Sequence, residues 1–220
     1  MSITFQDIKN NPAVRTYITK AGESMKAIGF TEHSFAHVTK VAETCEYILR
    51  GLAYDDHTVE LAKIAGYLHD IGNLVNRQDH SQSGALMAFR ILDHMRVDPE
   101  DIATIVTAIG NHDEGNGIPV SPVAAALILA DKSDVRRSRV SNPDVSTFDI
   151  HDRVNYSVEK SSLSFDEDKR VLHLTLQVDT SMSSVMDYFE IFLGRMIMCR
   201  KAAAKLGVSF KLIINDQILM

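Results

Sequence analysis

Histidines and aspartates at separate points of the sequence carry the strongest chemical signal in this chain. We call them the His/Asp set, and its members are His37, His69, Asp70, His80, His112 and Asp131. Imidazole and carboxylate groups are the usual ligands of first-row divalent metals. The set contains no cysteine, which argues against a structural zinc site. These residue types therefore predict a metal centre.

Two carboxylates of the set closely follow apolar runs. Asp70 comes after 64–68, and Asp131 comes after 124–130. A carboxylate at the end of an apolar helix face needs a partner where it is buried. Asp70 also adjoins His69. A carboxylate can bridge two ions, and an adjacent imidazole can then complete one of them. Most of the set falls at expected helix ends, where side chains of several helices face a shared space.

Hydrophobic residues recur at three- and four-residue spacing through the first two-thirds of the chain. This periodicity predicts helices with one apolar face. We expect them over about 35–50, 58–70, 81–95, 99–109 and 122–130. Pro99 and Pro122 suit the first turn of a helix, and Ser121 suits an N-cap. The larger part of the chain is therefore expected to be mostly α.

The pattern changes after about residue 140, where apolar residues begin to alternate. Val154, Tyr156 and Val158 start this alternation, which is typical of strands. The expected order is a β-hairpin over about 154–178, a helix over about 184–206 and a strand over about 208–214. This β-β-α-β order predicts a small α+β unit. We expect two domains, a helical metal-binding domain at 1–140 and an α+β domain of unassigned role at 150–220.

Two segments resemble the HD-domain superfamily of metal-dependent phosphohydrolases. They are AGYLHDIGN at 65–73 and ALILADKSD at 126–134, within a resemblance that covers about residues 30–140. The resemblance implies an HD-type helical bundle. His80 and His112 resemble the ligands of the two-metal subset. That subset includes the HD-GYP phosphodiesterases and the bacterial HD hydrolases of diadenosine tetraphosphate.

The resemblance also implies how the metal ligands divide. Asp70 would bridge two ions and be the catalytically essential carboxylate. The first ion would be completed by His37, His69 and Asp131, and the second by His80 and His112. The implied cofactors are two divalent transition-metal ions, iron or manganese first, with nickel, cobalt, zinc and magnesium left open. Such ions can hold a phosphate and lower the pKa of a water, whose hydroxide then attacks phosphorus.

The expected substrate is a small phosphorylated molecule, a nucleotide first. We predict that Asn73, Arg77, Lys132 and Arg136 bind it. Lys132 and Arg136 are four residues apart and would share a helix face. Many relatives have lysine at the position of Asn73, and only a lysine there could neutralise a phosphate. Asn111-His112 and Gly117-Ile118-Pro119 depart from the HD-GYP pattern, which argues against cleavage of cyclic dinucleotides.

Two other functions stay open at this point. A non-catalytic sensor would bind a nucleotide and metal tightly without turnover, and the α+β unit would transmit the signal. A di-iron oxygenase would use the same ligand types and would consume oxygen. The histidines outside the set are expected to be structural or at the surface, and they are His33, His57, His94, His151 and His173.

Composition limits the remaining classes. The chain has 220 residues and a net charge of −6, which argues against general nucleic-acid binding. Its longest apolar run, Val123–Ala130, is too short to span a bilayer, and residues 1–14 do not resemble a secretory signal. Cys45 and Cys199 are expected to be free thiols. We therefore expect a soluble cytoplasmic protein. Methionines and phenylalanines near the last helix favour a homodimer if they are exposed.

Overall fold

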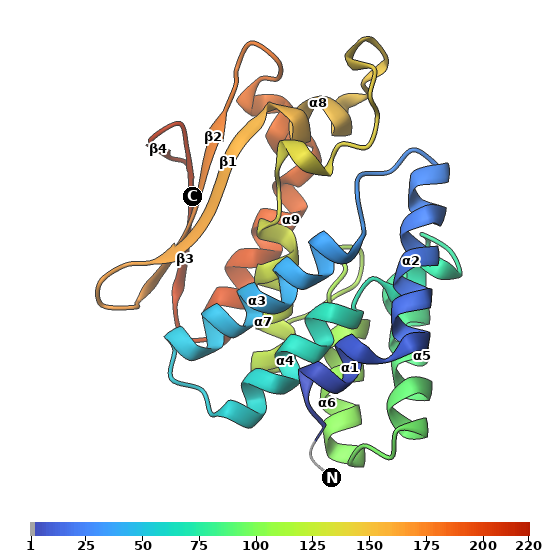
Figure 1. Ribbon diagram of the computed structural model, residues 1–220. Coiled ribbons are helices and arrows are strands. Elements are labelled where there is room, and N and C mark those ends of the chain that lie inside the picture. The colour runs from blue at the N-terminus through green and yellow to red at the C-terminus, as the bar shows by residue number, and fades with distance from the viewer. Residues whose placement is uncertain (1–2) are drawn as a thin grey trace.

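The computed structural model describes residues 3–220, and most of its regular structure is helical (Figure 1). The helices are α1 (Phe5–Asn10), α2 (Pro12–Ala27), α3 (Phe35–Gly51), α4 (Asp56–Leu68), α5 (His80–His94), α6 (Pro99–Gly110), α7 (Pro122–Ser133), α8 (Ile150–Ser157) and α9 (Val185–Lys205). Short 3-10 helices lie at Ile71–Leu74, Arg137–Arg139 and Val145–Thr147. The strands are β1 (Val158–Phe165), β2 (Val171–Val178), β3 (Ser209–Ile214) and β4 (Gln217–Ile218). The expected mostly α class with a C-terminal α+β unit is confirmed.

Local capping explains where the bundle helices begin. The side chain of Ser121 accepts a hydrogen bond from the Ala124 amide, and Pro122 occupies the first turn of α7. Asp98 caps α6 in the same way, with Pro99 in its first turn. Both pairs satisfy amides that have no partner inside the helix. The helix starts expected at the two prolines are confirmed.

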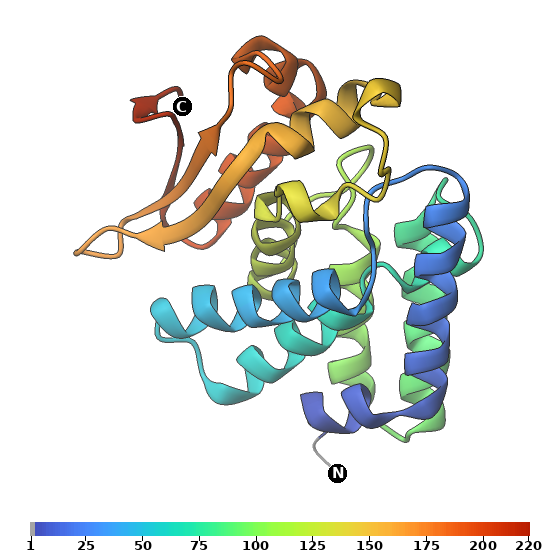
Figure 2. The ribbon, with the colours of Figure 1, turned by 45° about the horizontal axis from the view of Figure 1, so that its top comes forward.

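The four strands form one sheet in the order β1-β2-β3-β4. The pairs β1–β2 and β3–β4 are antiparallel, whereas β2 and β3 run parallel. Parallel neighbours need a crossover connection, and α9 supplies it. Figures 1 and 2 show α9 lying between the sheet and α7. The helix thereby joins the α+β unit to the helical bundle.

Helix α7 lies at the centre of the bundle. All its residues from Val123 to Ala130 are buried, and α3, α4, α6 and α9 pack around it. Close packing is also required between α3 and α4. A Cβ added at Gly66 would lie 3.0 Å from the Cα of Ala42, so the small residue lets the two backbones approach. The site residues at the ends of these helices are therefore positioned by closely packed helices.

One expectation about secondary structure is wrong, and two helices were not foreseen. Residues 154–157, predicted to begin the hairpin, belong instead to helix α8 (Ile150–Ser157), because Asp149 caps its start and accepts from the Asp152 amide. Val154 and Val158 fit both periods, since they are two steps apart on a strand face and four residues apart on a helix. Helices α1 and α2 were not expected from the polar N-terminal segment. The start of α2 was visible in the sequence as Asn11-Pro12, since asparagine is a common N-cap and proline suits the first turn. In the structure Asn11 accepts hydrogen bonds from two amides and Pro12 begins α2.

None of the helices within residues 3–220 combines the length and the apolar character that a membrane span requires.

Candidate metal centre

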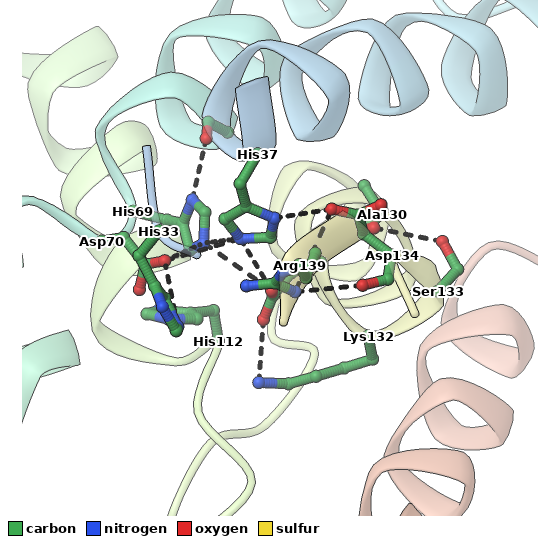
Figure 3. Close-up of polar contacts among 12 residues, drawn as sticks. His33, His37, His69, Asp70, His112, Ala130, Lys132, Ser133, Asp134 and Arg139 are labelled. Carbon is green, nitrogen blue, oxygen red and sulfur yellow. Dashed lines mark hydrogen bonds and ion pairs between the residues drawn. The ribbon is translucent and has the colours of Figure 1, made fainter. Parts of the chain in front are cut away.

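The His/Asp set converges in one buried space, although its members come from five parts of the bundle. His37 lies in the first turn of α3, His80 begins α5 and Asp131 lies near the end of α7. The pair His69-Asp70 follows α4, and His112 follows α6. All of these histidines and Asp70 are buried, and Asp131 is nearly so. Figure 3 shows the labelled histidines gathered around Asp70. The predicted set therefore comes together in space.

The imidazole nitrogens face one another in two pairs. The Nε2 atoms of His37 and His69 are 3.3 Å apart, and those of His80 and His112 are 3.1 Å apart. Ligands about 2.0–2.1 Å from one metal ion are themselves about 3.0–3.4 Å apart. Each nitrogen pair therefore has the spacing of two ligands on a single ion.

Each of these imidazoles is oriented by its other nitrogen. Nδ1 of His69 donates to the Gly66 carbonyl at 2.8 Å, and Nδ1 of His112 donates to the Ile109 carbonyl at 2.7 Å. The acceptors for His37 and His80 are the Asp134 carboxylate at 2.8 Å and the Arg77 carbonyl at 3.1 Å. A proton on each Nδ1 leaves the lone pair of Nε2 free. Each Nε2 faces the cluster and can offer its lone pair to an ion once it carries no proton, as metal binding requires.

The two oxygens of Asp70 face different histidines. Oδ2 lies 3.2 Å from His69 Nε2 and 3.5 Å from His37 Nε2. Oδ1 lies 3.5 Å from His80 Nε2 and accepts a 2.9 Å hydrogen bond from the Asn73 amide. Asp70 can therefore join the two nitrogen pairs. Three groups of ligand atoms within residues 3–220 meet the spacing of a metal site, and they are His37–His69–Asp70, Asp70–His80–His112 and His69–His112–Asp131.

The carboxylates make the cluster attractive to positive charge. Burial would raise the pKa of Asp70, but His69 and His33 hold it well below its usual range. Burial lowers the pKa of His69, yet Asp70 and Asp131 outweigh burial and raise it to about 10. A proton and a metal ion compete for the same lone pair on Nε2 of His69. Metal binding at this position is therefore coupled to proton release.

His33 also belongs to the centre, although its sequence context favoured a structural or surface role. Its Nδ1 atom lies 2.5 Å from the Thr31 carbonyl, and its Nε2 atom lies 4.0 Å from Oδ2 of Asp70. Figure 3 places its ring beside the other histidines. The only sequence signal was its closeness to His37, because no periodic pattern includes the loop before α3.

A cavity of about 350 Å³ adjoins the cluster. Residues of the set that line it are Asp70, His80 and Asp131. Other lining residues from the bundle are His33, Arg77, Glu114, Lys132 and Arg139. The far wall comes from beyond residue 140 and includes Asp149, His151, Asp152, Asn155, Phe192 and Arg195. Sequence reasoning missed this wall, because no motif connects these residues to the set.

Arg77 and Lys132 line the cavity, as a role in substrate binding requires. Lys132 is buried, and its ammonium lies 2.8 Å from Asp131 and 2.6 Å from Glu114. Burial lowers the pKa of Lys132, but the two carboxylates outweigh burial and raise it. The lysine therefore remains charged beside a metal ligand. The Nη1 atom of Arg77 lies 3.2 Å from Nε2 of His80, at the edge of the second nitrogen pair.

The other two residues predicted to bind substrate lie elsewhere. Asn73 is buried and holds Asp70 instead of lining the cavity. Arg136 donates from Nε to Asp134 at 2.8 Å and is absent from the cavity wall. The expectation that Lys132 and Arg136 share a helix face is wrong, because α7 ends at Ser133. Asn73 and Arg136 therefore act on the set indirectly. Asn73 contacts Asp70 and Arg136 contacts Asp134, and each of these aspartates contacts a histidine of the set.

The fold and the cluster define a helical protein with a buried His/Asp metal-binding centre. The family model of the HD domain matches residues 34–136, the stretch that contains the whole set. This part of the chain therefore matches the HD domain family. The C-terminal unit, which supplies the far wall of the cavity, lies outside the matched stretch.

Two known proteins are similar to the chain. An uncharacterised protein of Methanocaldococcus jannaschii is 24% identical over 212 residues, and the match covers 85% of this chain and 79% of the relative. The crystal structure of a predicted HD superfamily hydrolase from an uncultured Thermotogales bacterium is 25% identical. That match covers 60% of this chain and 73% of the other, with a TM-score of 0.44.

Proposed function

We propose that the chain is a metal-dependent phosphohydrolase that binds two divalent transition-metal ions, iron or manganese first, and acts on a small phosphorylated substrate such as a nucleotide. One observation carries the proposal. Four imidazole lone pairs and two carboxylates point into one buried space, and every Nδ1–H is already donated to an oxygen. Such a set of nitrogen and oxygen donors is typical of a binding site for divalent transition metals.

The residues fit two ions. His37, His69 and Asp131 would hold one, and His80 and His112 would hold the other. Asp70 would serve both, because Oδ1 and Oδ2 face different nitrogen pairs. When bound, such ions supply positive charge for a phosphate and lower the pKa of a water that can attack phosphorus.

The surrounding residues of this chain position the ligands and balance charge. Asn73 fixes Oδ1 of Asp70, and Asp134 fixes the ring of His37. Lys132 neutralises part of the charge of Asp131 and places an ammonium in the cavity wall. Arg77 stands over the ring of Phe30 with its guanidinium carbon 5.7 Å from the ring centroid. Both cations line the cavity beside the His/Asp set, where they could contact an anionic substrate.

Replacement of the shared carboxylate tests the proposal directly. Protein purified without added metal should contain about two ions per chain by mass spectrometry. Asp70→Ala should lose both ions, and hydrolysis of a panel of nucleotides and dinucleoside polyphosphates should fall more than about 100-fold. His80→Ala should lose only one ion, because the other nitrogen pair remains.

The matched control is Asp93→Ala, which removes an exposed aspartate from the end of α5. It should retain the metal content and the activity of the natural chain. Full activity of Asp70→Ala would contradict the mechanism. No bound metal after reconstitution with manganese or iron would contradict the proposal as a whole and favour the sensor.

A further inference from the structure

Helix α9 reaches the cavity beside the metal centre, although it lies outside the HD domain. Phe192 and Arg195 of this helix line the cavity together with Glu114, Asp131 and Lys132. The matched HD segment ends at residue 136. The α+β unit therefore contributes an arginine to a space whose other walls contain metal ligands.

Arg195 is connected to a metal ligand by a short series of contacts. Its Nε atom donates to Oε1 of Glu114 at 2.9 Å. The other oxygen of Glu114 lies 2.6 Å from the ammonium of Lys132, which lies 2.8 Å from Asp131. The guanidinium carbon of Arg195 also lies 4.8 Å from the ring centroid of Phe192. The ion pair and the ring together hold the guanidinium in one orientation.

The outer edge of this guanidinium is free. Within residues 3–220, the hydrogen bond and the ion pair of Arg195 both use Nε, and neither amino group has a protein partner. No buried side-chain nitrogen or oxygen in that part of the chain lacks a partner. The two amino groups therefore reach solvent at the cavity that Arg195 lines. The pair with Glu114 therefore leaves the amino groups of Arg195 available to a ligand in the cavity.

We infer that Arg195 binds a second anionic group of the substrate, next to the phosphate held at the metal centre. Two parallel N–H groups match two oxygens of a phosphate or a carboxylate, and a guanidinium is always charged. The inference rests on the proposed function and narrows its substrate to molecules with two neighbouring anionic groups, such as a phosphate chain. It also makes the α+β unit part of the substrate site.

Calorimetric titration with inorganic phosphate and inorganic pyrophosphate tests this assignment. The protein is loaded with manganese, and every titration contains the same excess of the metal, so chelation by pyrophosphate cancels between variants. Arg195→Gln should raise the Kd for pyrophosphate about tenfold or more and the Kd for phosphate less than about threefold. The Kd of Arg195→Lys for pyrophosphate should lie between those of the natural chain and Arg195→Gln, because lysine keeps the positive charge but lacks the two parallel N–H groups.

The control is Arg200→Gln, which removes an exposed arginine from the same helix and should change neither Kd. Equal effects of Arg195→Gln on both anions, or no effect on either, would overturn the inference. Failure of the natural chain to prefer pyrophosphate over phosphate would also overturn it. These outcomes leave the proposed function intact as long as metal content and hydrolysis still depend on Asp70.

Discussion

At the scale of the residue, His33 shows how burial sets a charge state. Burial lowers its pKa to about 3, with Asp70 opposing this effect and Arg139 adding to it. The ring is therefore neutral near neutral pH, and it packs at 5.7 Å between ring centroids against His37. In the unfolded chain the same imidazole titrates near its ordinary value of 6.5. Below that value the unfolded chain binds a proton that folded His33 does not take up.

The first prediction concerns acid stability. The native pKa is below the unfolded pKa, so the contribution of His33 is present above 6.5 and is lost as the pH falls towards 3. Between about pH 7 and about pH 5 it amounts to roughly 2 kcal/mol. Between these pH values the free energy of unfolding of the natural chain should therefore fall by roughly 2 kcal/mol more than that of His33→Gln. Urea unfolding with the metal chelated measures both values. His94→Gln, which removes an exposed histidine, should behave like the natural chain, and equal losses in His33→Gln would refute the argument.

At the scale of the element, the turn after α4 places the second nitrogen pair. The 3-10 helix Ile71–Leu74 packs against the first turns of α5, where His80 lies. A Cβ added at Gly72 would overlap the carbonyl oxygen of His80 and lie 2.5 Å from the amide nitrogen of Gly84. The close approach of these two backbones therefore needs glycine, and it determines where His80 stands.

We expect Gly72→Ala to separate this turn from α5. Overpacking of this kind costs about 1–3 kcal/mol, and the free energy of unfolding from urea denaturation should fall by that amount. The metal content should fall by about one ion per chain, because His80 moves away from Asp70. Gly194→Ala is the matched control, since nothing lies within 4 Å of the added Cβ. It should raise stability by about 0.5–1 kcal/mol, and a similar gain in Gly72→Ala would contradict the packing argument.

At the scale of the whole molecule, the bundle and the α+β unit share a continuous hydrophobic core. Cys45 of α3 lies in the bundle part of this core, and Cys199 of α9 lies in the C-terminal part. Both thiols are free and buried. Burial raises the pKa of Cys199 to about 12 and also raises that of Cys45. Neither thiol is therefore expected to react in the native state.

The division into domains at 1–140 and 150–220 remains a prediction, and thiol labelling tests it. Because α7 packs against α9, we expect the two parts to unfold together. Pulse labelling with iodoacetamide in increasing urea should then give one midpoint for both thiols. Cys45→Ala and Cys199→Ala isolate the two signals. Earlier labelling of Cys199 would instead show that the C-terminal unit unfolds as a separate domain.

Residue chemistry and periodicity predicted much of this molecule. Five bundle helices were expected from three- and four-residue spacing and from helix-start residues, and the structure contains all five. Helix α7 is buried on every side from Val123 to Ala130, so its cap at Ser121 was the clearer signal. The His/Asp set was expected from ligand types near helix ends, and all its members meet in space. Local patterns failed at Val154 and Val158, whose spacing fits both a strand and a helix. They also failed in α1 and α2, where helix caps stabilise a segment whose polar composition did not indicate a helix.

The sequence by itself determined the class of fold and the ligand set, because helical periodicity and ligand chemistry are properties of local residue types. Only the tertiary structure decided which other groups surround the ligands. His33 from a loop reaches the centre and Arg195 from α9 lines the adjoining cavity, whereas Arg136 pairs with Asp134. Such contacts join residues far apart in the chain, and they depend on how the helices pack. No spacing rule in the sequence describes that packing, so the cavity and its far wall could be identified only from the tertiary structure.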